Sequence, residues 1–216
     1  MIDEILPRGV VTAEAFGEEL SHAELFPEEE QVIARSVDKR RHEFTAGRAC
    51  ARRALAGLGV PPAPLLPGER GAPRWPAGIV GSITHCAGYR AAAVARASEV
   101  TAVGIDAEPH DLLPDGVLDQ IATPGELTLL PELRAAAPKV CWDRLLFSAK
   151  ESIYKVWFPV AGRWLGFEDA VVTPDPDAGV FTARLLVPAP PPLAGTLHGR
   201  WMVRDGLALT TITILF

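Results

Sequence analysis

The sequence lacks paired cysteines, long apolar runs and an excess of positive charge, and each absence excludes a class of protein. Its three cysteines, Cys50, Cys86 and Cys141, lie far apart, so they form neither a CxxC motif nor a disulfide framework. No uninterrupted apolar run approaches the roughly 20 residues that cross a bilayer. The formal net charge of −6 argues against general nucleic-acid binding.

The start of the sequence also lacks the pattern of a secretion signal. Met1 to Glu4 ends in two acids, and Pro7 and Gly9 follow, whereas a signal peptide has a basic segment and then an apolar one. Together with the isolated thiols, this predicts a cytoplasmic protein with no membrane partner.

Proline and glycine are abundant by contrast, at 20 and 19 of the 216 residues. So many chain breakers predict short elements joined by loops. The richest stretches predict loops at residues 61–76, 112–125 and 188–192.

Helices and strands are expected between these loops. Helical periodicity predicts a helix that begins at Pro27 and continues, with or without a break, to Gly57, and a second helix from Trp142 to Phe158. Short apolar or alternating runs predict strands at residues 79–86, 91–97, 100–108, 167–173, 181–187, 199–204 and 207–215.

A sequence echo suggests that the chain consists of two similar halves. Phe44–Arg48 and Phe147–Glu151 share the order phenylalanine, hydroxyl residue, alanine, any residue and charged residue, and the order of helix and strands repeats around them. We therefore expect an N-terminal half of residues 1–104 and a C-terminal half of residues 105–216. The active site is expected at their interface.

Two carboxylates, Asp106 and Glu108, follow the apolar run that begins at Val103. Residues two apart on a strand point to the same side, so these side chains project together. Paired carboxylates repel each other unless a proton or a cation lies between them. Their oxygens suit Mg²⁺ or Mn²⁺ bound together with substrate phosphate. The alternative is a strand that runs out into solvent and carries two ordinary surface acids.

The second predicted helix carries a polar face made of Ser148, Glu151, Ser152 and Lys155. On a functional interpretation, Glu151 is a third metal ligand or a base, and Lys155 neutralises phosphate. The alternative is an ordinary surface ion pair between these two residues.

Hydroxyl groups and an imidazole lie between two glycines in the segment Gly81–Gly88. Ser82, Thr84 and His85 can all contact phosphate oxygens, and glycine allows close backbone approach. The alternative for His85 is a structural role. A nucleophilic pair of His85 with Cys86 is disfavoured, because adjacent residues on a strand point to opposite faces.

A basic segment lies within this acidic chain, between Arg35 and Arg53. Arg41, Arg48 and Arg52 form a stripe along the first predicted helix, which is either a solvated flank or a phosphate clamp. A local cationic segment indicates a specific anionic partner.

Four segments together resemble the motifs of the 4′-phosphopantetheinyl transferases. They occur in the same order as in that family, and the match is best to its long, monomeric subfamily and to actinobacterial members. The segments are Arg40–Phe44, Gly81–His85, Val103–Glu108 and Phe147–Lys155.

The resemblance implies an α+β fold of two similar halves in a pseudo-twofold arrangement, and a monomer. It implies that coenzyme A binds at the junction of the halves with Mg²⁺, or with Mn²⁺. The phosphopantetheine arm would pass to a serine of apo acyl carrier or peptidyl carrier proteins. These carriers serve polyketide, nonribosomal peptide, siderophore or fatty-acid synthesis.

Motif matching also implies roles for the polar residues. Asp106, Glu108 and Glu151 would hold the metal, and Glu151 would be the base for the serine hydroxyl. Lys155 would stabilise charge on the transferred and leaving phosphates.

The remaining matches concern coenzyme A itself. Thr84 and His85 would contact its phosphates, and Lys150 is a further candidate for a phosphate contact. Arg48, with Arg40, would bind the 3′-phosphate end.

Two other functions fit the same residues. One is a metal-dependent hydrolase of coenzyme A or another nucleotide diphosphate, which needs no protein acceptor. The other is a binding protein for an anionic ligand. Binding an anion needs no carboxylates, so the acids near Lys155 argue against this second alternative.

Overall fold

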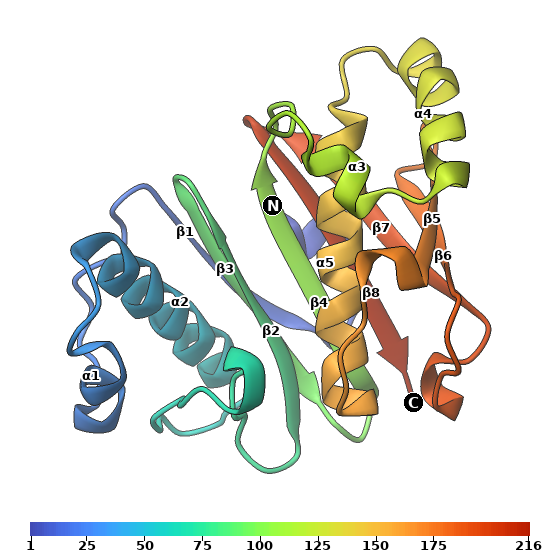
Figure 1. Cartoon of the computed structure of the whole chain (residues 1–216). Coiled ribbons are helices and arrows are strands. Elements are labelled where there is room, and N and C mark those ends of the chain that lie inside the picture. Colours follow the sequence, from blue (N-terminus) through green and yellow to red (C-terminus); the bar gives the residue numbers. More distant parts are fainter.

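The computed structural model describes all 216 residues and has an α+β fold with two antiparallel sheets (Figure 1). The first sheet has the strand order β1-β3-β2 and the second has the order β4-β8-β7-β6-β5. None of the helices is long and apolar enough to span a bilayer. The strands are β1 (Val11–Phe16), β2 (Ile79–Cys86), β3 (Tyr89–Arg96), β4 (Val100–Pro109), β5 (Ala170–Asp175), β6 (Val180–Leu185), β7 (Thr196–Arg204) and β8 (Leu207–Leu215). The α-helices are α1 (Pro27–Ile33), α2 (Asp38–Gly57), α3 (Val117–Ile121), α4 (Pro124–Ala136) and α5 (Trp142–Ala161).

The long helix α2 covers one face of the first sheet (Figure 1). Its buried side chains, including Cys50, Ala54 and Leu55, pack against Ala92 and Val94 of β3. Small residues on both surfaces allow the helix to approach the sheet closely.

The long helix α5 packs in the same way on the second sheet, against β4 and β8 (Figure 1). The contact is closest at Gly104, where an added Cβ would lie 2.2 Å from the carbonyl oxygen of Ser152. Three buried tryptophans contribute to this core, and the rings of Trp142 and Trp201 meet edge to face at 5.2 Å. The glycine therefore sets the spacing between β4 and the helix that carries Glu151 and Lys155.

The same chain path occurs twice. In the first half, β1 leads to a 20-residue helix and then to the β2–β3 hairpin, and the strands take the order β1-β3-β2. In the second half, β4 leads to the 20-residue helix α5 and, after the added β5–β6 hairpin, to the β7–β8 hairpin, in the order β4-β8-β7. The two halves thus have corresponding elements around their long helices.

The boundary predicted at 104/105 needs correction. It falls inside β4, and β4 pairs along its length with β8, from Val100 with Leu215 to Pro109 with Leu207. The sheet topology therefore places the whole of β4 with the second half.

Several predicted elements have the expected bounds. The strands at 79–86 and 207–215 match β2 and β8. The second helix begins at Trp142 as predicted and ends three residues later than predicted, at Ala161, because Pro159 is accommodated in its last turn. Gly162 then adopts a left-handed conformation, with φ of 62°, and ends the helix.

Three regions differ from expectation. The segment 112–125, predicted as a loop, contains α3 and the start of α4, where Thr123 and Glu126 cap each other's backbone. The strand predicted at 167–173 begins only at Ala170, after a short 3₁₀ turn, and β1 was not predicted.

Candidate active site

The two halves meet along a seam between β2 and β4, which lie side by side without a backbone ladder (Figure 1). Two side-chain hydroxyls of β2 instead make hydrogen bonds with the backbone of β4. Ser82 Oγ accepts the N–H of Ile105 at 3.2 Å, and Thr84 Oγ1 accepts the N–H of Ala107 at 3.0 Å. The residue between these two amides is Asp106, so its carboxylate is held at the seam.

Asp106 is 5% exposed, and its two oxygens have different surroundings. Oδ1 accepts from Lys155 Nζ at 2.8 Å and from Thr84 Oγ1 at 3.2 Å, while Oδ2 is buried and has no hydrogen-bond partner. Lys155 also donates to the carbonyl of Ile105 at 2.9 Å. A buried carboxylate oxygen without a partner is costly unless a ligand supplies one.

Glu108 lies two residues further along β4 and is paired with Arg144 of α5. Arg144 Nη1 donates to Glu108 Oε2 at 2.9 Å, and the same guanidinium donates to the carbonyls of Asp111 and Leu112. Burial raises the pKa of Glu108, and the like charge of Asp106 raises it further, whereas Arg144 acts in the opposite direction. Nothing in the sequence pattern pointed to Arg144.

Glu151 faces the seam from α5. Burial raises its pKa, Asp106 raises it further, and Lys155 lowers it. The surface ion pair considered for Glu151 and Lys155 is not formed, because Lys155 is paired with Asp106. A carboxylate with a raised pKa beside a cationic group is typical of functional sites.

The three carboxylates fit a divalent cation by their chemistry. All three supply hard oxygen donors. One oxygen of Asp106 is paired with Lys155 and one oxygen of Glu108 with Arg144, and the second oxygen of each carboxylate has no cationic partner. The buried Oδ2 of Asp106, which has no hydrogen-bond partner in the protein, is the feature that best fits a bound cation. The side chains do not converge into a set of three metal-ligating groups in this structure.

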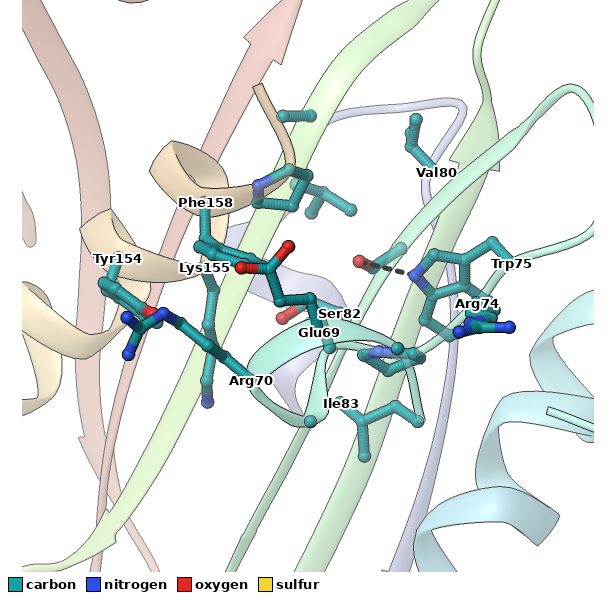
Figure 2. A pocket seen from close by; sticks show the side chains of 18 of the residues that line it. Glu69, Arg70, Arg74, Trp75, Val80, Ser82, Ile83, Tyr154, Lys155 and Phe158 are labelled. Atoms are coloured by element: carbon teal, nitrogen blue, oxygen red, sulfur yellow. Dashed lines mark hydrogen bonds between the residues drawn. The ribbon is translucent and has the colours of Figure 1, made fainter. Parts of the chain in front are cut away.

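A cavity of about 610 Å³ opens at the seam (Figure 2). It is bounded by the loop Gly68–Trp75, by β2 and β4, and by α5, whose Glu151 and Lys155 line it. The loop is held in place by Trp75, whose Nε1 donates to the carbonyl of Gly81 at 3.0 Å. The predicted loop at 61–76 is therefore a wall of the site.

Arg70 and Tyr154 meet across this cavity from opposite halves (Figure 2). Arg70 lies 5.3 Å from the ring centre of Trp164, which in turn packs against Tyr154 at 5.1 Å. The sequence offered no local signal for either residue, because their proximity depends on the tertiary fold.

A second cavity, of about 250 Å³, lies beside the first and is basic. Arg40, Arg48 and His85 line it, and it shares Gly71 and Ile83 with the larger cavity. The sequence-predicted contacts for the 3′-phosphate end are thus brought together at one place, next to the seam.

Arg48 is held rigidly at this second cavity. Its Nε donates to the carbonyl of Leu65 at 2.8 Å, and its guanidinium lies 4.1 Å from the ring centre of Phe44. Burial lowers its pKa to about 10, with Glu29 opposing and Arg40 adding to the shift, so it remains charged at neutral pH. Its two terminal nitrogens make no hydrogen bond to the protein and remain free for a ligand.

His85 lies between an acid and a base. Glu43 is 3.7 Å from Nδ1, and Arg40 is 3.4 Å from Nε2. Burial lowers the pKa of His85, Glu43 opposes this shift, and Arg40 and Lys155 add to it. The lowered pKa favours the neutral imidazole at pH 7.

Two predicted phosphate contacts need correction. Lys150 is turned into the protein, where Nζ pairs with Glu126 at 2.8 Å and donates to the carbonyls of Ile121, Phe167 and Ala170, so no proton is left for phosphate. Thr84 is buried, and its hydroxyl donates to Asp106 and accepts from Ala107. Thr84 positions the carboxylate instead of binding phosphate directly.

Comparison with known proteins assigns the chain to a family. Residues 28–95 match the family model described as the 4′-phosphopantetheinyl transferase N-terminal domain, and residues 102–206 match that of the 4′-phosphopantetheinyl transferase superfamily. The first match ends near the end of β3 and the second begins near the start of β4, which agrees with the division of the strands between the two sheets.

Similar proteins from three bacteria carry the same family name. The chain is 53% identical to the 4′-phosphopantetheinyl transferase Svp of Streptomyces mobaraensis, over 99% of this chain and 89% of that protein. It is 52% identical to PptT of Mycobacterium tuberculosis, over 97% and 98% of the two chains. It is 49% identical to Npt of Nocardia iowensis, over 98% and 99%. The chain therefore belongs to the 4′-phosphopantetheinyl transferase superfamily.

Proposed function

We propose that this protein transfers the 4′-phosphopantetheine arm of coenzyme A to a serine of an apo acyl carrier or peptidyl carrier protein. One observation carries the proposal. The basic cavity of Arg40, Arg48 and His85 adjoins the larger cavity, which Lys155 and Glu151 both line. This pair of cavities fits a long substrate with phosphates at one end and an uncharged arm at the other.

The phosphate-binding residues would orient coenzyme A. Arg48, fixed by Leu65 and Phe44, offers its free nitrogens to the 3′-phosphate, and Arg40 adds a second guanidinium. His85 faces the diphosphate from the same cavity, and its neighbour Arg40 favours an anion there. The substrate would be held across the seam by this end.

The transfer itself would occur beside Glu151 and Lys155. The serine Oγ attacks the β-phosphorus, its proton passes to the Glu151 carboxylate, directly or through water, and the bond to adenosine 3′,5′-bisphosphate breaks. Lys155 stabilises the charge that develops on the phosphate oxygens. Burial and the charge of Asp106 raise the pKa of Glu151, which favours its taking up a proton as long as no cation is bound to it.

Asp106, Glu108 and Glu151 would hold Mg²⁺, or Mn²⁺. When bound, the ion would neutralise the diphosphate and polarise its phosphorus–oxygen bonds. Arg144 keeps one oxygen of Glu108 fixed, and Thr84 and Lys155 do the same for Asp106. The protein would act as a cytoplasmic monomer on carriers of polyketide, nonribosomal peptide, siderophore or fatty-acid synthesis.

The test is a mass-shift assay on a panel of apo carriers from those pathways, with coenzyme A and Mg²⁺. The proposal expects at least one carrier to gain the mass of one phosphopantetheine arm. A hydrolase would instead release adenosine 3′,5′-bisphosphate at the same rate without a carrier, and a pure binding protein would show tight binding without turnover. Either of these results would contradict the proposal.

A further inference from the structure

A buried glutamate outside the proposed reaction centre, Glu29 of α1, is connected to the phosphate cavity. Glu29 is 0% exposed. Its carboxylate accepts from the backbone N–H of Phe26 at 3.0 Å and from Arg52 Nη1 at 2.8 and 2.9 Å. It also accepts the N–H of Leu65, at 2.8 Å. All of these partners lie within the first half.

Leu65 links this carboxylate to the substrate-binding arginine. The N–H of Leu65 donates to Glu29, and its carbonyl accepts from Arg48 Nε at 2.8 Å. Leu65 is itself 0% exposed, so packing on all sides restrains it. The position of the guanidinium therefore depends on the orientation of the Leu65 residue, which Glu29 fixes through the amide hydrogen.

A corresponding glutamate in the second half has no such link. Glu126 of α4 is also the third residue of a short helix that precedes a long one, is 3% exposed and is paired with a cation of the long helix, Lys150. It too accepts a backbone N–H from a distant segment, that of Val172 at 2.7 Å. Val172 lines neither of the two cavities that face the substrate.

We infer that Glu29 is a positioning residue for Arg48, which it holds through Leu65 in the orientation that binds the 3′-phosphate of coenzyme A. This inference rests on the proposed function. It makes the short helix α1 a determinant of specificity for coenzyme A over its 3′-dephospho form, although no residue of α1 is proposed to touch the reacting atoms. Glu126 serves as the structural counterpart without this role.

The test measures binding, so it does not depend on turnover. Adenosine 3′,5′-bisphosphate and adenosine 5′-monophosphate are titrated into the whole protein by calorimetry, for wild type, Glu29→Gln, Arg48→Gln and the double variant. We expect wild type to bind the bisphosphate more tightly than the monophosphate. In each single variant the ratio of the two dissociation constants should shrink about tenfold, the size expected for a hydrogen bond to a charged group. The double variant should lose hardly more than Arg48→Gln alone, because one interaction cannot be removed twice.

Control variants separate positioning from general loss of stability. Glu126→Gln removes the equivalent buried charge in the second half and should lower the melting temperature while leaving the preference within twofold of wild type. If Glu29→Gln folds poorly, Glu29→Asp keeps the charge but is too short to reach Leu65 and Arg52 together, and it should show the same loss. Equal loss of preference in Glu126→Gln, or additive losses in the double variant, would overturn the inference.

The proposed function can fail separately. If wild type prefers the bisphosphate and Glu29→Gln does not, the positioning role stands even when no carrier gains mass. If a carrier gains mass and Glu29→Gln keeps the full preference for the bisphosphate, the transferase function stands and the positioning role is wrong.

Discussion

At the scale of single residues, two lysines of one helix show how local position decides function. Lys155 is paired with Asp106 at the seam and its side chain is 24% exposed, whereas Lys150 is paired with Glu126 and only 1% exposed. Five residues turn a helix by about 140°, so the two ammonium groups leave it in different directions. Burial lowers the pKa of Lys150 and Glu126 opposes that shift. These contacts argue for a structural role of Lys150 and for placing Lys155 in the candidate site.

Replacing each lysine by methionine should separate these roles. Lys150→Met leaves the Glu126 carboxylate buried without a cation, so the free energy of unfolding should fall by about 3–5 kcal/mol. Its KM for coenzyme A, measured below the melting temperature, should stay near that of wild type. Lys155→Met should instead slow transfer strongly. A tenfold rise in KM for coenzyme A in Lys150→Met would contradict this, because it would show that Lys150 contacts a phosphate of the substrate.

The protonation of His85 should respond to the substrate. The pKa of His85 lies below its ordinary value because burial disfavours the charged imidazole; Glu43 opposes this shift, and Arg40, Lys155 and Arg90 add to it. A bound phosphate favours the imidazolium, so the pKa should rise on binding. Affinity should accordingly increase as the pH falls from the bound-state pKa towards the free-state pKa. NMR titration of His85, with and without adenosine 3′,5′-bisphosphate, measures both values, and identical values would show that His85 does not face the ligand.

The residues with local patterns could be predicted from the sequence. Strand alternation placed Asp106 and Glu108 on one side, and helical spacing placed Glu151 and Lys155 on one face. Arg144 could not be found in this way, because its interaction with Glu108 depends on how α5 packs on β4.

At the scale of elements, the spacing of β4 and α5 depends on the absence of a side chain at Gly104. In Gly104→Ala, the Cβ would meet the Ser152 carbonyl at 2.2 Å, which neither backbone can relieve without moving. We expect a loss of about 1–3 kcal/mol in unfolding free energy, as for an overpacked core, and a drop in transfer rate as Glu151 shifts from Asp106.

Gly125→Ala is the matched control for this prediction. Gly125 lies in α4 with open space around the added Cβ, so the substitution should stabilise the protein by roughly 0.5–1 kcal/mol through helix propensity. Chemical denaturation of the two variants beside wild type tests the pair. Equal stability of Gly104→Ala and wild type would contradict the close contact.

The missed elements have different physical causes. The start of α4 carries a usable sequence signal, because Thr123, Pro124 and Glu126 form an N-cap, a first-turn proline and a capping partner. The prolines and glycines around it masked that signal. The strand β1 has no comparable signal, since it is stabilised by pairing with β3, from Val11 with Val94 to Phe16 with Tyr89.

At the scale of the whole molecule, the positions of the groups proposed for catalysis depend on how two similar halves meet. Thr84 of the first half holds Asp106 and the N–H of Ala107 in the second. Thr84→Val removes both hydrogen bonds while keeping a side chain of nearly the same shape. The free energy of unfolding should fall by about 1–3 kcal/mol. Transfer should slow at the same time. Thr173→Val, on an exposed position of β5, is the control and should change neither quantity.

The repeat itself was visible in the sequence, whereas its boundary was not. The echo between Phe44–Arg48 and Phe147–Glu151 marks the two corresponding helices. The apolar run up to Glu108 gave no sign of where one half ends, because only the pairing of β4 with β8 assigns that strand. Some of the abundant prolines and glycines lie in the loop Gly68–Trp75, which lines the cavity between the halves.

The most direct test of the account is the mass of an apo carrier protein incubated with coenzyme A, Mg²⁺ and either wild type or Glu151→Gln. Wild type should add one phosphopantetheine arm per carrier. Glu151→Gln should fold normally and react at least about 100-fold more slowly, because it loses the base at the seam. A folded Glu151→Gln that modifies the carrier as fast as wild type would contradict the assignment of the reaction to the seam.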